Sequence, residues 1–341
     1  MNKEIKTFGF ADLATQNKGN NKFLNSVNEL IDWNRIEKII TKYDKRGKNA
    51  VGNSSYSGLL LFKMILLQTW FNLSDVEVEE ASNDRISFMK FLDLSIESDI
   101  PDHSTISRFR TRLNSKNAFD MLFKEINKQL EEKELIVKTG AIIDASIISA
   151  NRRPNKIVNM VEDRKEEDNS TTNQIEMDDI ELSKDPDAKW IKKGSKSYFG
   201  YKIHNAVDEN GFILGGSVSA ANVADMRELE NILDDINLPV GSAVMGDKGY
   251  AYPSLREELK KRKYEDFIML KKKKNQVLSE FEKAFNKGIS KIRYRVEQTF
   301  GVLKQHYNFT RVRYVGLEKV KMEYRIKSMA LNIKKAVNIA F

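Results

Sequence analysis

A change of pattern near residue 135 constrains the fold more than any other feature of the sequence. Before it, apolar residues recur at the spacing of amphipathic helices; after it, short β-branched runs alternate with helical segments. The first of these runs, AIIDASII at 141–148, is typical of a central strand. The sequence therefore predicts an all-helical part at 1–135 and an α/β part at 136–341.

The helical part carries clear signals for helix starts. Ser74 precedes a helical run with Glu77 three residues later, the arrangement of a capping box. The turn sequence IPDHST at 100–105 similarly introduces a helix. Helices are expected at 24–43, 56–71, from 75 to 81, at 105–113 and at 119–133.

The second part predicts a mixed sheet with helices on its faces. Residues 200–207 and 212–219 read as strands joined by the turn Asp208-Glu209-Asn210-Gly211, which favours antiparallel pairing. Later strands alternate with helices, an order that favours parallel pairing. Further strands are expected at 242–245 and 267–270, and helices at 225–236, 253–262, 290–306 and 317–336.

One segment within the α/β part has a different composition. Residues 162–187 contain eleven acidic and three basic side chains with almost no apolar periodicity. Such a composition is typical of a solvated or disordered segment. We expect an acidic flexible insertion at about 160–190.

Composition excludes several kinds of site. The chain has no cysteine and three histidines, so thiolate zinc sites, disulfides and cysteine nucleophiles are excluded. A metal, if used, is then expected to be a hard cation bound by carboxylates. The net charge of +8 favours a polyanionic partner such as nucleic acid. The first residues lack a signal-peptide pattern, and the longest apolar stretch, 59–70, is too short to span a bilayer, so we expect a cytoplasmic protein with no membrane partner.

Three acidic residues stand out by their positions. Asp144 interrupts an apolar strand, where a carboxylate is costly unless it is paired or binds a metal, although it could also be a turn or capping acid. Asp247 follows another short strand and is flanked by glycines; a simple turn role is the plain alternative. Glu297 shares one helix face with Arg293 and Lys304, which could also be an ordinary surface ion pair.

Together these acids favour metal-assisted chemistry at phosphorus. Two strand acids and one helix acid could converge on two Mg²⁺ ions, with Mn²⁺ as a plausible substitute. Such chemistry needs carboxylates for the metal and cations for the phosphate.

The same motifs carry a family resemblance. Asp144 in the first strand, the stretch GYKIHNAVD at 200–208, the GDKGY motif at 246–250 and the helix at 293–304 resemble the DDE transposases of bacterial insertion sequences. The insertion-sequence-five type is the most similar branch, and the helical region at 56–113 resembles that family's N-terminal domain. The resemblance extends over about 50–340.

The resemblance implies a fold and a catalytic set. It implies a ribonuclease-H-like catalytic domain at 136–341, in which Asp144, Asp247 and Glu297 are the catalytic, metal-binding triad. Arg293 and Lys304 would be the basic companions of the glutamate, and with Lys248 they would bind DNA phosphates. The helical part at 1–135 would bind DNA ends or dimerise.

Further DNA contacts are expected from basic residues. Lys202 and His204 alternate onto one face of their strand, where they would meet DNA or simply face solvent. A role for His204 as a metal ligand is disfavoured because Mg²⁺ prefers oxygen. Residues 260–313 contain sixteen basic and five acidic side chains, a local excess that suits phosphate binding.

These observations predict a DNA transposase. The expected reaction is metal-dependent hydrolysis at the element's terminal inverted repeats, followed by attack of the freed 3′-hydroxyl on target DNA, with a homodimer holding two ends at the bacterial nucleoid. Two alternatives remain: a nuclease of the same fold without strand transfer, and a transposase-derived DNA-binding protein with an inactive site.

Overall fold

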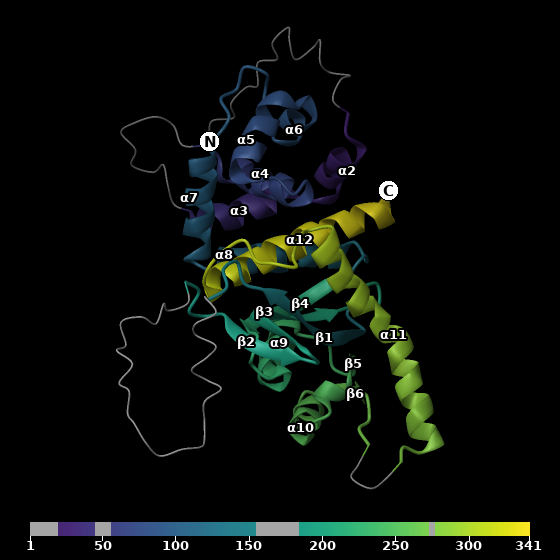
Figure 1. The fold of residues 1–341 in the computed structure, drawn as a ribbon. Helices are drawn as coiled ribbons and strands as arrows, with labels where there is room; N and C mark the ends of the chain where they lie inside the picture. Colours follow the sequence, from purple (N-terminus) through teal and green to yellow (C-terminus); the bar gives the residue numbers. More distant parts are fainter. Residues whose placement is uncertain (1–19, 45–55, 155–183, 273–276) are drawn as a thin grey trace, which may run out of the picture.

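The computed structural model of the chain describes residues 20–44, 56–154, 184–272 and 277–341. In these residues helices lie above a mixed sheet, and one long helix separates the two (Figure 1). A continuous cluster of buried apolar side chains extends from the first helices into the sheet.

The first part of the chain is helical, as predicted. Ser74 begins α5 with the predicted capping box, because its hydroxyl accepts from the Glu77 N–H and the Glu77 carboxylate accepts from the Ser74 N–H. The helices of this part are α2 (Lys22–Leu30), α3 (Trp33–Tyr43), α4 (Gly58–Trp70), α5 (Asp75–Asp84), α6 (Ile86–Phe91), α7 (His103–Asn114) and α8 (Ala118–Glu132).

The single helix expected at 24–43 was wrong, because α2 and α3 are separate helices. Asp32 lies between them with an extended backbone, and its carboxylate accepts from the Asn34 N–H at the start of α3. Gln129 of α8 holds the Asp32 backbone from both sides, accepting from its N–H and donating to its carbonyl oxygen. A distant side chain therefore stabilises a break that local periodicity does not reveal.

The sheet has six strands among the described residues, and it is mixed as predicted. β1 pairs antiparallel with β3 and parallel with β5, β5 pairs parallel with β6, and both β2 and β4 pair antiparallel with β3. This arrangement is consistent with the expected ribonuclease-H-like fold. The strands are β1 (Gly140–Ser149), β2 (Lys189–Lys193), β3 (Lys196–Val207), β4 (Ile213–Ala220), β5 (Ala243–Gly246) and β6 (Glu265–Ile268).

Helices pack on both sides of this sheet. α11 (Glu280–Gln305) crosses β1, β3 and β5, whereas α9 (Leu229–Ile236) packs against β3 and β4 and follows the short 3₁₀ helix η3 (Asp225–Glu228). The remaining helices are the short η4 (Lys248–Tyr250), α10 (Pro253–Lys261) and α12 (Leu317–Ala340).

Two elements differ from the sequence prediction. α11 begins ten residues before the expected Ser290, at a capping box formed by Ser279 and Glu282. The strand β2 was not predicted; it pairs with the start of β3 through a turn at Gly194, whose φ of 62° suits glycine. The acidic insertion expected at about 160–190 lies mostly outside the described residues, at 155–183.

α12 joins the helical part to the sheet. It contacts α2, α4 and α8 on one side and β4 on the other, and it lies between the upper helices and the sheet in Figure 1. The Trp70 indole N–H donates to the Ala330 carbonyl across this contact. Within the described residues, no single helix has the length and apolar composition needed to cross a membrane; only the pair α4 and α5, bent by 103°, meets that test together, on length and composition alone.

A buried amide of α12 provides a test of this packing. Asn332 is fully buried; its side chain accepts from the Ile213 N–H and donates both to the Ile213 carbonyl and to the Asn127 side chain of α8. Replacing it by alanine leaves these groups without partners. We expect Asn332→Ala to lower the free energy of unfolding by about 2–4 kcal/mol in urea titrations. The exposed Asn231→Ala should stay within about 0.5 kcal/mol of wild type, and equal losses in both variants would contradict this account.

Candidate active site

Strand pairing places Asp144 and Asp247 next to each other. In the parallel ladder of β1 and β5, Ile143 pairs with Gly246, so the two aspartates are the next residues on neighbouring strands. Asp247 directly follows β5, whereas β1 continues past Asp144 in its pairing with β3. The carboxyl ends of parallel strands are a common place for ligand sites in α/β sheets.

The loop after Asp247 is shaped by hydrogen bonding to its carboxylate. Asp247 is the N-cap of η4, and its Oδ1 atom accepts from the Gly249 N–H at 2.7 Å. A Cβ atom at position 249 would lie 2.7 Å from that same oxygen, so any larger residue there would force the Asp247 carboxylate to move. Gly249 therefore lets the backbone fold closely around the aspartate. Asp247 therefore has the turn role named above as its alternative explanation, and it also lies beside Asp144.

Arg293 of α11 joins Asp144 to Glu297. Its Nη2 atom donates to Asp144 Oδ2 at 2.8 Å and lies 3.8 Å from Glu297 Oε1. Glu297 and Asp144 therefore lie no further apart than the sum of these two distances. The arginine side chain is largely buried, whereas 63% of the Glu297 side chain is exposed. Glu297 is thus near Asp144, on the exposed side of Arg293.

The surroundings of Asp144 disfavour its charged form. Its pKa is raised above the ordinary value, chiefly by burial; Arg293 and the Ala145 N–H oppose the rise, and the nearby Asp247 adds to it. A buried carboxylate of this kind gains from a cation at its side. In this structure, the guanidinium of Arg293 supplies that positive charge.

The two lysines expected to bind phosphate lie beside β1 and directly after Asp247. The Lys304 ammonium donates to Ser146 Oγ at 2.6 Å, two residues along β1 from Asp144, and its pKa is lowered by burial and then by Lys193. Lys248 is exposed directly after Asp247. Alternating side chains share a strand face, so Asp144 and Ser146 both face α11.

The structure places Lys202 and His204 away from this site. They pair with Ile147 and Ala145, the β1 residues that face away from α11. Lys202 is 7% exposed and donates to Asp225 and to the Val223 carbonyl oxygen. His204 is fully buried and contacts Ser219. The strand face was expected either to border the site or to face solvent; instead it is buried beside η3 and α9, so neither side chain is positioned to meet DNA.

The sequence reading gave no role to two further residues near the acids. Tyr250 is buried with a hydroxyl that has no hydrogen-bond partner among the described residues, and burial followed by Asp225, Asp144 and Asp247 raises its pKa well above the ordinary value. Lys193 acts on Lys304 from β2, the strand that was not predicted. Tyr250 was visible as part of the GDKGY motif, but no sequence signal indicated that its hydroxyl is buried beside the acids.

The donor set suits a hard divalent cation. Asp144, Asp247 and Glu297 offer only carboxylate oxygens, the ligands that such cations prefer. Among the described residues, however, no three acidic or histidine side chains are close enough to hold one ion as they stand. The Arg293 guanidinium lies between two of the acids, so a metal requires Glu297 and Arg293 to rearrange.

Comparisons with known proteins agree with this geometry. A family model described as "Transposase DDE domain" matches residues 136–333, and one described as "Transposase domain (DUF772)" matches residues 12–112. The chain belongs to the DDE transposase family. It is also 35% identical over 233 residues, which is 68% of this chain and 77% of the relative, to the transposase for insertion sequence element IS1106 from Neisseria meningitidis serogroup B. No solved structure matches.

Membership of the DDE transposase family establishes the general activity. The protein is a DNA transposase, it acts on DNA, and its family depends on divalent metal. The expectation of a bacterial insertion-sequence transposase with a mixed sheet and an N-terminal helical region is therefore confirmed.

The burial of His204 predicts a dependence of stability on pH. Burial lowers its pKa to about 4, with Asp225 and Glu228 opposing and Lys202 adding to the effect. The unfolded chain, with a histidine pKa near 6.5, therefore binds the proton more tightly, and stability should be lost as pH falls from about 6.5 to about 4. In urea titrations across this range we expect His204→Gln to lose less stability than wild type, by up to roughly 3 kcal/mol.

A second histidine provides the control for this experiment. The side chain of His103 is 54% exposed, and His103→Gln should keep the acid sensitivity of the wild type. Parallel stability profiles for His204→Gln and wild type would contradict the assignment.

Proposed function

We propose that this DNA transposase hydrolyses the phosphodiester bond at the terminal inverted repeats of its element and then transfers the freed 3′-hydroxyl to target DNA. The catalytic residues in this proposal are Asp144, Asp247 and Glu297. The observation that supports it most is the adjacency of Asp144 and Asp247 on β1 and β5, with Glu297 joined to Asp144 through Arg293.

The proposed cofactor is a pair of Mg²⁺ ions, for which Mn²⁺ is a plausible substitute. Asp144 and Asp247 would hold them, and Glu297 would complete the set from its exposed position on α11. When bound, such ions activate the attacking oxygen and stabilise the leaving oxygen in an in-line displacement at phosphorus.

Arg293, Lys304 and Lys248 bind DNA phosphates in this proposal. Arg293 carries the fixed charge closest to Asp144, so it neutralises that carboxylate before DNA arrives and is then available for a phosphate. Lys304 is held beside β1 by Ser146, which positions its ammonium along the same edge. Lys248 is exposed beside Asp247 and needs no rearrangement to reach the DNA backbone.

We assign the two parts of the chain separate roles. Residues 136–341 form the catalytic domain, and residues 1–135 bind the DNA ends or dimerise. Transfer of an element requires two ends in one complex, which favours a homodimer on DNA of the bacterial nucleoid.

Replacing a proposed catalytic acid by its amide tests the site. We expect Asp247→Asn and Glu297→Gln to reduce cleavage of terminal-repeat DNA at least 10³-fold, an order of magnitude typical of removing a group needed for charge stabilisation. Binding of uncleaved DNA should be retained. Cleavage is followed on denaturing gels and binding by fluorescence anisotropy.

Glu280→Gln is the matched control, because Glu280 lies on the same helix, is 91% exposed and pairs only locally with Lys283. Full cleavage by Asp247→Asn would refute the catalytic assignment. Cleavage by the wild type without joined donor–target products would favour a nuclease, and cleavage-independent binding alone would favour a DNA-binding protein.

The position of Arg293 predicts a competition with metal. Without DNA, we expect Arg293→Gln to bind Mn²⁺ several-fold more tightly than wild type in calorimetric titrations at pH 8, because its guanidinium no longer occupies Asp144. Glu297→Gln should bind Mn²⁺ more weakly. Equal affinities in wild type and Arg293→Gln would show that the arginine does not compete.

A further inference from the structure

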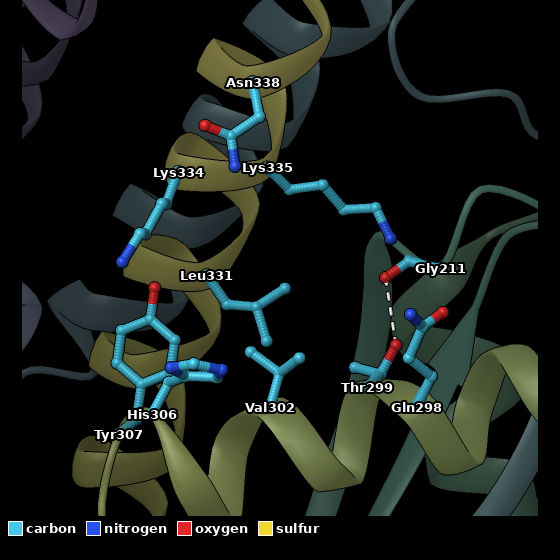
Figure 2. Close-up of a pocket in the computed structure, with 10 residues that line it drawn as sticks. All are labelled: Gly211, Gln298, Thr299, Val302, His306, Tyr307, Leu331, Lys334, Lys335 and Asn338. Atoms are coloured by element: carbon cyan, nitrogen blue, oxygen red, sulfur yellow. Dashed lines mark hydrogen bonds between the residues drawn. The ribbon is translucent and has the colours of Figure 1, made fainter. Parts of the chain in front are cut away.

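A basic cavity lies on the other side of α11 from the proposed catalytic acids. It has a volume of about 300 Å³ and lies between α11, α12 and the turn that joins β3 to β4 (Figure 2). Its lining is Gly211, Gln298, Thr299, Val302, His306, Tyr307, Leu331, Lys334, Lys335 and Asn338.

Helix geometry separates this cavity from the catalytic site. Residues of an α-helix advance by about 100° each, so Thr299 is turned by about 200° from Glu297 and faces nearly the opposite way. Thr299 donates to the Gly211 carbonyl at 3.1 Å, which fixes the β3–β4 turn against this face of α11. The cavity therefore shares a helix with the catalytic residues but none of their side chains.

The lining carries positive charge and no carboxylate. Lys334 and Lys335 point to opposite sides of the cavity in Figure 2, and neither ammonium forms a hydrogen bond or ion pair within the described part of the chain. Lys335 lies 5.4 Å from the centre of the Phe212 ring, over the turn at Gly211.

Asp208 acts electrostatically on Lys335, but the two form no hydrogen bond or ion pair in the described part of the chain. Burial lowers the Lys335 pKa, and Asp208 opposes this effect. However, Asp208 is fully buried, and its carboxylate already accepts from the Phe212 and Val137 N–H groups. A partly desolvated ammonium without a paired carboxylate gains from an external anion.

Neutral donors complete the cavity. Gln298 and Asn338 are exposed residues of the lining and carry amide N–H groups, and His306 is a further exposed lining residue. Val302 and Leu331 form an apolar floor (Figure 2). Two ammonium groups and two amides around an apolar floor suit a phosphodiester group with its adjoining sugar.

We propose that this cavity binds the backbone of duplex DNA at a second contact, outside the catalytic site. This rests on the proposed function only in that the polyanion is DNA. Lysines act here as point charges on phosphate, which contributes affinity and salt dependence without sequence preference. A second contact on α11 would hold DNA on both sides of the helix that carries Glu297.

The salt dependence of DNA binding tests the second contact. The probe is a random-sequence duplex in EDTA, which prevents cleavage, with wild type compared to Lys334→Gln/Lys335→Gln. Losing two phosphate contacts should reduce the slope of log affinity against log salt by about 2 and weaken binding about tenfold at low salt. Because Lys335 is half-buried, a second variant, Asn338→Asp, adds a carboxylate at an exposed position and should also weaken binding.

Lys319→Gln/Lys321→Gln on the same helix is the charge-matched control. An unchanged slope in the cavity variants, or an equal decrease in the control, would overturn the proposal. If inorganic phosphate stabilises the wild type but not the cavity variants, and the salt slope of DNA binding is the same in both, the cavity is a site for small anions instead. Glu297→Gln should keep the wild-type slope while losing cleavage, so failure of the catalytic assignment is read from cleavage and failure of the second contact from the slope.

Discussion

The parallel pairing of β1 with β5 is the constraint on which the rest of the site depends. It sets Asp144 beside Asp247, the residue that follows β5, although the two aspartates are 103 positions apart in the sequence. The antiparallel partner β3 fixes the other side of β1 and thereby decides which side chains face α11. Because side chains alternate along a strand, a shift of one residue in this ladder would turn Asp144 toward α9 and away from Glu297.

Electrostatic balance in the site depends on Arg293. Burial, with a smaller contribution from Asp247, raises the pKa of Asp144, and the guanidinium opposes that rise without cancelling it. The same arginine lies 3.8 Å from Glu297, so one cation acts on two of the three acids. Arg293 therefore offsets part of the negative charge of these carboxylates, and in the proposed mechanism a divalent cation takes over that role at Asp144.

The sequence predicted most of the helices and the central strands well, because those features are local patterns of period, caps and turns. It failed where a distant residue decides the outcome. Gln129 holds the break at Asp32 that divides one expected helix into two. Whether Lys202 and His204 lie near the acids depends on which face of β3 meets α11, and an alternating pattern alone cannot distinguish the two faces. The catalytic roles of Asp144, Asp247 and Glu297, and the division at residue 135, remain predictions.

The length of α11 places the proposed catalytic residues and the basic cavity on one continuous helix. Its capping box at Ser279 starts the helix ten residues before the expected Ser290, and the helix packs against β1, β3 and β5. α12 in turn is fixed to α8 and β4 through Asn332 and to α4 through Trp70. The proposed DNA contact and Glu297 therefore lie on one continuous helix, with buried packing on both sides of it. In the proposed mechanism, DNA bound on the cavity side would hold the helix that carries Glu297, the most exposed of the three proposed catalytic acids.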